Sequence, residues 1–211
     1  MLSPDALTTL EALKTELGIP ADDTTQDEAL ARAVNAASDA IRRYCRRDFA
    51  RSEVTEQLQG NGSPRLVLAR TPVVDVIAMH LWDDPIDLDT ITIDRDSGIL
   101  TGRNVWPESD VPNVTVEYVG GYVTPAQASA GQDRDLPFDI EEACLIIAST
   151  RVQAMGQPVD AQIMQVEQIR VHFAEGGRQT LPVAATALLD PYGVPLLARL
   201  ELLDDQLVRE H

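Results

Sequence analysis

Four arginines lie close together in the segment AIRRYCRRDF, residues 40–49. They are Arg42, Arg43, Arg46 and Arg47. A guanidinium group presents a planar fork of N–H donors that matches either a phosphate or a carboxylate. The cluster therefore offers two kinds of chemistry: binding of a nucleic acid backbone, or salt bridges to acidic protein surfaces.

The charge of the whole chain bears on this choice. The 211 residues include 34 acidic and 17 basic side chains, which gives a formal net charge of -17. A strongly negative protein repels phosphate at long range, so nucleic acid binding is disfavoured unless the charge is strongly segregated. Cations are also favoured at the C-terminal end of a helix. We therefore expect the four arginines to form salt bridges with acidic neighbours, within the chain or in another subunit.

An acid-rich stretch at residues 83–98, DDPIDLDTITIDRDSG, is the first candidate for a metal site. A calcium loop of the EF-hand type needs oxygen ligands at its first, third and fifth positions and glycine at the sixth. With Gly98 at the sixth position, the ligand positions hold Ile93, Arg95 and Ser97. The match fails, and the alternation of acids with Ile and Leu predicts the exposed face of a strand. We expect no metal ion here.

Other reactive side chains are few. The histidines are His80, His172 and His211, and no nucleophile or metal signature lies beside them. The two cysteines, Cys45 and Cys144, lie in helix-like segments and are interpreted as small buried hydrophobic residues. We expect no catalytic residue and no cofactor. The sequence also lacks the long apolar segment of a signal peptide or a membrane span.

Apolar residues spaced by threes and fours predict helices at about residues 8–18, 26–47 and 139–155. Thr8 with Glu11, and Thr25 with Glu28, form capping boxes that predict the first two helix starts. The second helix ends in the arginine cluster. Its expected buried stripe is Leu30, Ala33, Val34, Ala37, Ile41, Tyr44 and Cys45.

Between the second and third helices the hydrophobic period changes to two. Short alternating segments, separated by turn residues, fill about residues 52–123 and predict a small antiparallel β-subdomain. The last of them ends in VGGY, residues 119–122, which we interpret as a kink at the end of a strand.

A final helix is predicted from about residue 194, with Pro195 in its first turn. Its leucine stripe is Leu196, Leu197, Leu200, Leu203 and Leu207. Two interpretations stay open for this stripe: a seam in the core of the same domain, or an arm that docks in a groove of another protein.

These elements predict an α+β fold whose core is a helical bundle of three to four main helices. A small antiparallel β-subdomain is inserted into the bundle, and a helical arm follows at the C-terminus. We expect residues 1–193 to form one domain and residues 194–211 to form the arm.

Five segments follow one another in a recognisable order: ALARAVNAASDAIRRYCRRDF, GNGSPRLVLARTPVVDVIAM, VTVEYVGGY, LPFDIEEACLIIA and ALLDPYG. In this order they resemble the head-to-tail connector family of long-tailed bacteriophages, also called adaptor or head-completion proteins. The similarity covers about residues 7–193.

The resemblance implies a structural virion protein without enzymatic activity. Members of the family form a ring of about a dozen copies, here expected to be twelve, under the portal protein in the neck. The ring assembles in the host cytoplasm and extends the DNA channel toward a stopper or another tail-side neck protein. DNA passes through without specific binding. The four arginines would then contact the neighbouring subunit, and the leucine stripe would dock on the portal.

Two other functions compete with this one. The first is a nucleic-acid-binding regulator that uses the basic cluster from Arg42 to Arg51, and the second is a small hydrolase or metal-binding enzyme that uses the aspartates of residues 83–96. The net charge and the absence of catalytic or metal motifs argue against both.

Overall fold

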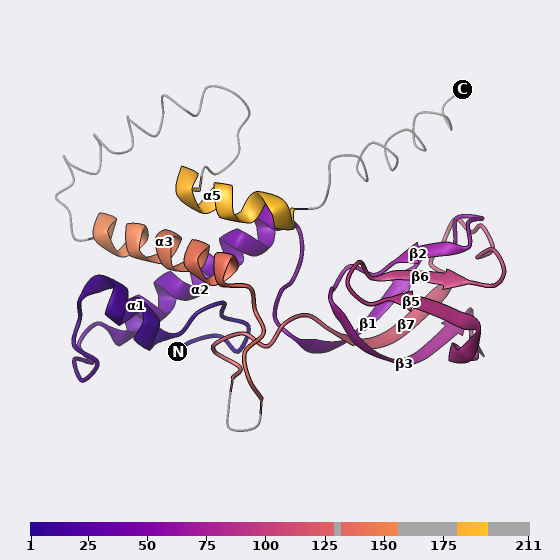
Figure 1. Ribbon diagram of the computed structural model, residues 1–211, viewed down its shortest axis with the longest axis horizontal. Helices are drawn as coiled ribbons and strands as arrows, with labels where there is room; N and C mark the ends of the chain where they lie inside the picture. Colours follow the sequence, from indigo (N-terminus) through magenta and orange to yellow (C-terminus); the bar gives the residue numbers. More distant parts are fainter. Residues whose placement is uncertain (129–131, 156–180, 194–211) are drawn as a thin grey trace. The chain divides into compact units, whose positions relative to one another are not determined.

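The structure is a computed structural model, and it describes residues 1–128, 132–155 and 181–193. The chain divides into two compact units (Figure 1). The helical unit comprises Met1–Arg47 and Pro137–His211, and the β unit comprises Asp48–Leu136. The β unit is thus inserted between the two parts of the helical unit.

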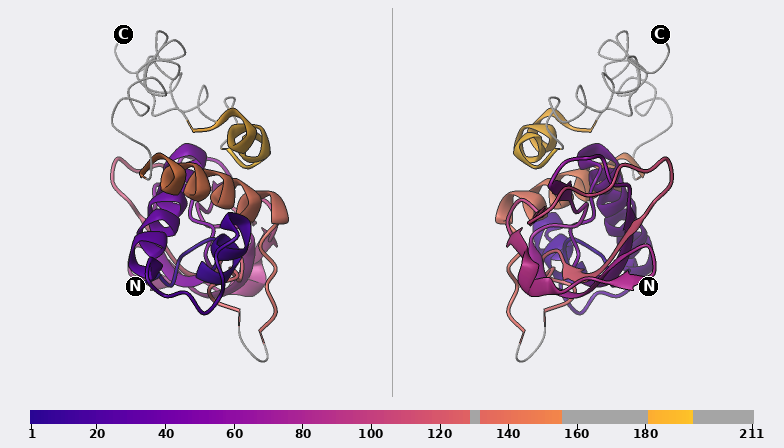
Figure 2. Two further views of the ribbon diagram at one scale, coloured as in Figure 1. Left: turned by 90° about the vertical axis from the view of Figure 1, so that its left-hand side faces the viewer. Right: turned by 90° about the vertical axis from the view of Figure 1, so that its right-hand side faces the viewer.

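Four α-helices occur in the described part of the helical unit. They are α1 (Leu10–Leu17), α2 (Asp27–Cys45), α3 (Phe138–Met155) and α5 (Val183–Leu189), and the 3-10 turn η2 (Asp190–Tyr192) follows α5 directly. The helix α3 contacts each of the other three. In the left view of Figure 2 it lies between α5 and the pair formed by α1 and α2.

The longest helix, α2, buries one face because its apolar residues recur at helical spacing. Its fully or almost fully buried positions include Leu30, Ala33, Val34, Ala37, Ile41 and Cys45, which confirms most of the predicted stripe. Tyr44 is the exception. It is 39% exposed, so its predicted burial is wrong.

The N-caps of the first two helices each lie one residue after the predicted position. The N-cap of α1 is Thr9, whose side chain accepts a hydrogen bond from the Ala12 N–H, whereas Thr8 is buried and its hydroxyl donates to Glu141 Oε1. The N-cap of α2 is Gln26, without a side-chain cap. The Thr25 hydroxyl donates instead to Asp23 Oδ1.

The β unit contains two antiparallel sheets. The four-stranded sheet has the order β1-β7-β3-β4, and the three-stranded sheet has the order β2-β6-β5. The strands are β1 (Ser52–Leu58), β2 (Arg65–Val67), β3 (Val73–Leu81), β4 (Asp84–Pro85), β5 (Ile91–Asp94), β6 (Ile99–Gly102) and β7 (Val114–Gly120), and the 3-10 turn η1 (Leu88–Thr90) precedes β5.

Both sheets contribute to one hydrophobic core. The central strand β7 alternates strictly between buried and half-buried residues, as expected for a strand with one face on a core. The buried members of this core are Leu66, Leu68, Val73, Val76, Met79, Leu100, Trp106, Val114, Val116 and Tyr118.

The predicted fold class is therefore wrong. The described chain is a mixed α and β structure in which two antiparallel sheets enclose their own core, and it is not a helical bundle with a minor β insert. The physical reason is that each short strand carries only a few inward apolar residues, while seven strands together bury a complete core.

The predicted kink at VGGY is confirmed. β7 ends at Gly120, and Gly121 has φ of 95°. A Cβ atom on Gly121 would lie 2.7 Å from the Ala50 carbonyl oxygen. Only glycine lets the two backbone segments approach this closely.

Arg70 fixes the segment that leads into β1. Its guanidinium donates to the Ala50 carbonyl at 2.7 Å, to Ser52 Oγ at 2.8 Å and to Asp48 Oδ2 at 2.9 Å. Nearby, the Arg51 guanidinium pairs with the Asp135 carboxylate. The two arginines therefore tie the entry of the β unit to its own residues.

Candidate functional site

The arginine cluster lies where α2 ends. Arg42 and Arg43 occupy the last turn of α2, and Arg46 is the C-cap residue, in the left-handed conformation with φ of 55°. Arg47 follows the cap. The predicted helix is thus two residues too long at its C-terminal end, because Arg46 leaves the right-handed helical conformation. We call Arg42, Arg43, Arg46 and Arg47 the arginine turn.

The four side chains of the arginine turn differ in their contacts. Arg42 Nη1 lies 3.2 Å from Asp39 Oδ1, in an exposed pair of the kind that contributes below about 1 kcal/mol. Arg47 is half-buried. Arg43 and Arg46 are exposed, and they make no hydrogen bond or ion pair with the described residues. Two guanidinium groups are therefore available to a partner.

The helix α5 and the turn η2 pack beside the arginine turn. The Tyr44 hydroxyl donates a 2.6 Å hydrogen bond to Asp190 Oδ1, and Cys45 Sγ lies 4.0 Å from the Leu189 carbonyl oxygen. Burial raises the pKa of the Cys45 thiol to about 11, so the thiol is protonated at neutral pH. This cysteine is a buried packing residue, as the sequence predicted.

Cys144 also lies in the interior of the helical unit, on α3. Its Sγ lies 3.6 Å from the hydroxyl of Ser38 on α2. Burial raises the pKa of the Cys144 thiol to about 12, which makes it a poor nucleophile.

The aspartates of residues 83–96 are spread over three places in the β unit, at or beside turns. Asp83 and Asp84 lie at the hairpin between β3 and β4. Asp87 Oδ1 accepts from the Asp89 N–H beside η1, and Asp94 Oδ1 accepts from the Asp96 N–H in the turn after β5. In the described residues, no three His, Cys, Asp or Glu side chains come together as a metal site would require.

The histidines are separated as well. His80 lies on β3, opposite Pro85 of β4. His172 and His211 lie outside the described residues, as does the predicted leucine stripe Leu196, Leu197, Leu200, Leu203 and Leu207. Of the helices that the structure describes, none has the length and apolar character needed to cross a membrane.

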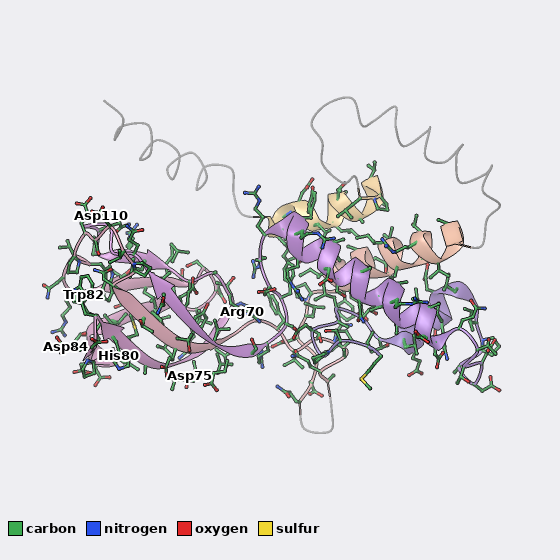
Figure 3. The ribbon with its side chains drawn as sticks, turned by 180° about the vertical axis from the view of Figure 1, so that it is seen from behind. Arg70, Asp75, His80, Trp82, Asp84 and Asp110 are labelled. Atoms are coloured by element: carbon green, nitrogen blue, oxygen red, sulfur yellow. The ribbon has the colours of Figure 1, made fainter. Side chains whose placement is uncertain are left out.

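A surface that the sequence analysis missed lies at the far end of the β3–β4 hairpin. Trp82 is 55% exposed and has φ of 57°, and its backbone N–H donates to the Asn113 carbonyl at 2.6 Å. Figure 3 shows Trp82, His80, Asp84 and Asp110 at one end of the β unit, with Arg70 at the other. The available signal was a tryptophan in LWDDP, at a turn position that favours asparagine or glycine.

The loop beside Trp82 is held by hydrogen bonds. Asn113 is 3% exposed, and its side chain accepts from the Gly60 N–H at 2.7 Å and donates to the Pro107 carbonyl at 2.9 Å. The same loop carries Val111, which is 54% exposed. This end of the β unit is therefore an ordered surface with two exposed apolar side chains.

Solved structures of similar fold come from gene transfer agent (GTA) particles. A chain in the neck of the empty particle, computed with C6 symmetry, aligns with a TM-score of 0.60 and 16% identity, over 92% of this chain and 93% of that chain. A chain in the virion of the native particle gives 0.58 and 16%, over 92% and 93%. A chain in the neck of the native particle, computed with C12 symmetry, gives 0.54 and 16%, over 92% and 96%.

These alignments show that the fold is shared over nearly the whole chain. A search of curated proteins finds no match. The model of the head completion protein family matches residues 6–149, which is more than half of the sequence and includes parts of both units. This chain belongs to the head completion protein family.

Proposed function

We propose that this protein is a structural component of the neck of a phage-like particle. Twelve copies form a ring that docks on the portal protein and extends the DNA channel toward a stopper or other tail-side neck protein. The observation that carries this proposal is the family match over residues 6–149, together with a fold shared with neck chains over nine-tenths of the sequence. The protein has no enzymatic role in this proposal.

The charge supports a channel that DNA passes without adhesion. Each chain carries a formal charge of -17, and a ring multiplies this value by its copy number. Even a few cationic contacts hold DNA strongly, because they release condensed counterions. A wall of acidic subunits instead repels the duplex and lets it slide.

The basic cluster supports a protein partner rather than a nucleic acid. Arg51 is engaged by Asp135 and by the Gly121 carbonyl, and Arg42 is paired with Asp39. The remaining arginine turn is small, and we assign it to contacts between neighbouring subunits. The arm of residues 194–211, with its leucine stripe, is our candidate for portal docking.

Native mass spectrometry tests the proposal. The purified protein is measured alone and then with purified portal, and a closed ring in either sample is the expected result. Deletion of residues 194–211 is expected to abolish portal docking. A species that stays monomeric in both samples would overturn the proposal. Salt-sensitive binding to duplex DNA that is lost in the variant with Arg46→Ala and Arg47→Ala would favour the regulator instead.

A further inference from the structure

Arg46 and Trp82 share an unusual backbone conformation. Among the described residues they are the two that have positive φ without being glycine, at 55° and 57°. Glycine occupies the other four such positions, and one of them, Gly18, caps α1 as Arg46 caps α2. A positive φ is sterically unfavourable for any residue with a Cβ atom, and most of all for a bulky residue. Strain of this kind clusters at functional sites, so both residues are candidates for a role beyond folding.

Trp82 belongs to an exposed surface with both apolar and acidic character. We define the tip patch as Trp82, Asp83, Asp84 and Val111. Asp83 and Asp84 are exposed, and their carboxylates make no hydrogen bond or ion pair within the described part of the chain. Figure 3 shows Trp82 and Asp84 at the same end of the β unit. An exposed tryptophan beside free carboxylates fits a partner that offers guanidinium groups.

The arginine turn offers such groups. Arg43 and Arg46 are exposed, and neither has a partner among the described residues. A guanidinium pairs with a carboxylate through two N–H groups and also stacks on an indole face. The same chain thus carries two free arginines and a surface with two free carboxylates and a tryptophan.

We propose that the tip patch of one copy binds the arginine turn of the next copy. The occupant is a second copy because the complementary charges lie on two different surfaces of one chain. A contact between two different surfaces is heterologous, and it repeats from copy to copy until a ring closes. This inference rests on the proposed ring, and it names the residues that hold neighbouring copies in register.

Charge exchange between the two surfaces gives the sharpest test. In the full chain, one variant carries Asp83→Arg with Asp84→Arg, and the other carries Arg43→Asp with Arg46→Asp. Each variant alone brings like charges together at every contact, so the ring is lost. An equimolar mixture restores the contact, because the reversed tip of one variant meets the reversed turn of the other.

Native mass spectrometry of the mixture provides a specific readout. Rescue requires the two variants to alternate, so the rings contain equal numbers of each. Recovery on mixing also shows that both variants are folded. The matched control is a chain with Asp22→Arg and Glu53→Arg, which changes the net charge as the tip variant does but at exposed sites outside both surfaces. This control is expected to assemble like the wild type.

Trp82→Asn separates assembly from folding. Asparagine tolerates positive φ, so the melting temperature is expected to stay the same or rise. Removal of the indole is expected to weaken association by about tenfold or more, as for a tryptophan at the centre of an interface. Val67→Thr, at a 60% exposed position on β2, is the control and is expected to leave association unchanged.

The outcomes distinguish this contact from the ring itself. If the wild type forms rings only in the presence of portal protein, the two charge-reversed variants are mixed in the presence of portal protein. Rings that both charge-reversed variants still form alone, or a mixture that is not rescued, would overturn the contact and leave the proposed function standing. A tip patch required only for binding a different neck protein would also overturn it. A wild type that is monomeric with and without portal would overturn both.

Discussion

The hydroxyl of Tyr44 on α2 donates a 2.6 Å hydrogen bond to the Asp190 carboxylate at the start of η2. The two residues lie 146 positions apart in the sequence. This bond, with Cys45 packed beside Leu189, fixes the last turn of α2 against α5 and η2. The arginine turn is therefore presented from a helix end that is anchored on one side.

We predict that Tyr44→Phe lowers the free energy of unfolding by about 1 kcal/mol, since one hydrogen bond to a carboxylate is lost at a partly exposed site. The measurement is urea unfolding of the full chain, followed by circular dichroism. Tyr122→Phe is the matched control, because the Tyr122 hydroxyl makes no hydrogen bond to the described residues. Equal stability of the two variants would show that the Tyr44 bond contributes nothing.

Gly121 gives a second prediction. With φ of 95° and the Ala50 carbonyl 2.7 Å from an added Cβ, Gly121→Ala must strain the backbone and displace a neighbouring segment. We expect a loss of roughly 2 kcal/mol or more in the free energy of unfolding. Gly193→Ala is the control, because its nearest atom is 3.6 Å away and its φ is -68°. That change should be neutral or slightly stabilising.

The sequence predicts a helix correctly when a single apolar face determines which of its residues are buried. Leu30, Val34 and Ile41 are buried because their spacing matches the helical period, which is a local property of the chain. The N-caps were predicted one residue too early because neighbouring polar residues, such as Thr8 and Thr9, are equally good cap candidates by sequence alone. Thr8 is withdrawn from capping by Glu141, a partner 133 residues away. Such tertiary partners cannot be read from local patterns.

The β unit was underestimated for a related reason. Tyr118 and Leu100 lie on strands of different sheets, and their shared burial depends on how the sheets pack. The tip patch could not be predicted because Asp83 and Asp84 belong to an acidic run in which no pair stands out from the others. LWDDP is only a weak signal for a turn, and the positive φ of Trp82 depends on its hydrogen bond to Asn113, which lies farther along the chain. The arginine turn was found because a charge cluster at a helix end is visible in the sequence itself.

Cys45 predicts a pH dependence. Burial raises the pKa of its thiol from 9.0 to about 11, so between these values the unfolded chain releases a proton that the folded chain retains. The contribution of Cys45 to the free energy of unfolding is therefore fully present below pH 9 and is lost as the pH rises from 9 toward 11. In Cys45→Ala, we expect the free energy of unfolding to fall less steeply with pH between 9 and 11, by about 1 kcal/mol per pH unit. Urea unfolding at a series of pH values measures it, and an unchanged slope would contradict the assignment.

Lys14, the single lysine of the chain, supports a last prediction. Its side chain is buried. Its ammonium forms an ion pair with Asp27 Oδ1 at 2.6 Å and donates a hydrogen bond to the Ala21 carbonyl at 3.3 Å. Asp27→Asn leaves this charge buried without its carboxylate. Because Asp27 is partly exposed, we expect a loss of about 2 kcal/mol, below the range for a fully buried pair.

Amine labelling distinguishes this local effect from general destabilisation. In the wild type, an amine-reactive reagent should modify the N-terminus much faster than Lys14, whose ammonium is held by Asp27 and Ala21. In Asp27→Asn, modification of Lys14 should accelerate at a denaturant concentration where the chain is still folded. Asp22→Asn removes an exposed carboxylate from the same loop. It should change neither the free energy of unfolding nor the rate at which Lys14 is modified. Fast labelling of Lys14 in the wild type would mean that the ion pair does not hold the loop between α1 and α2.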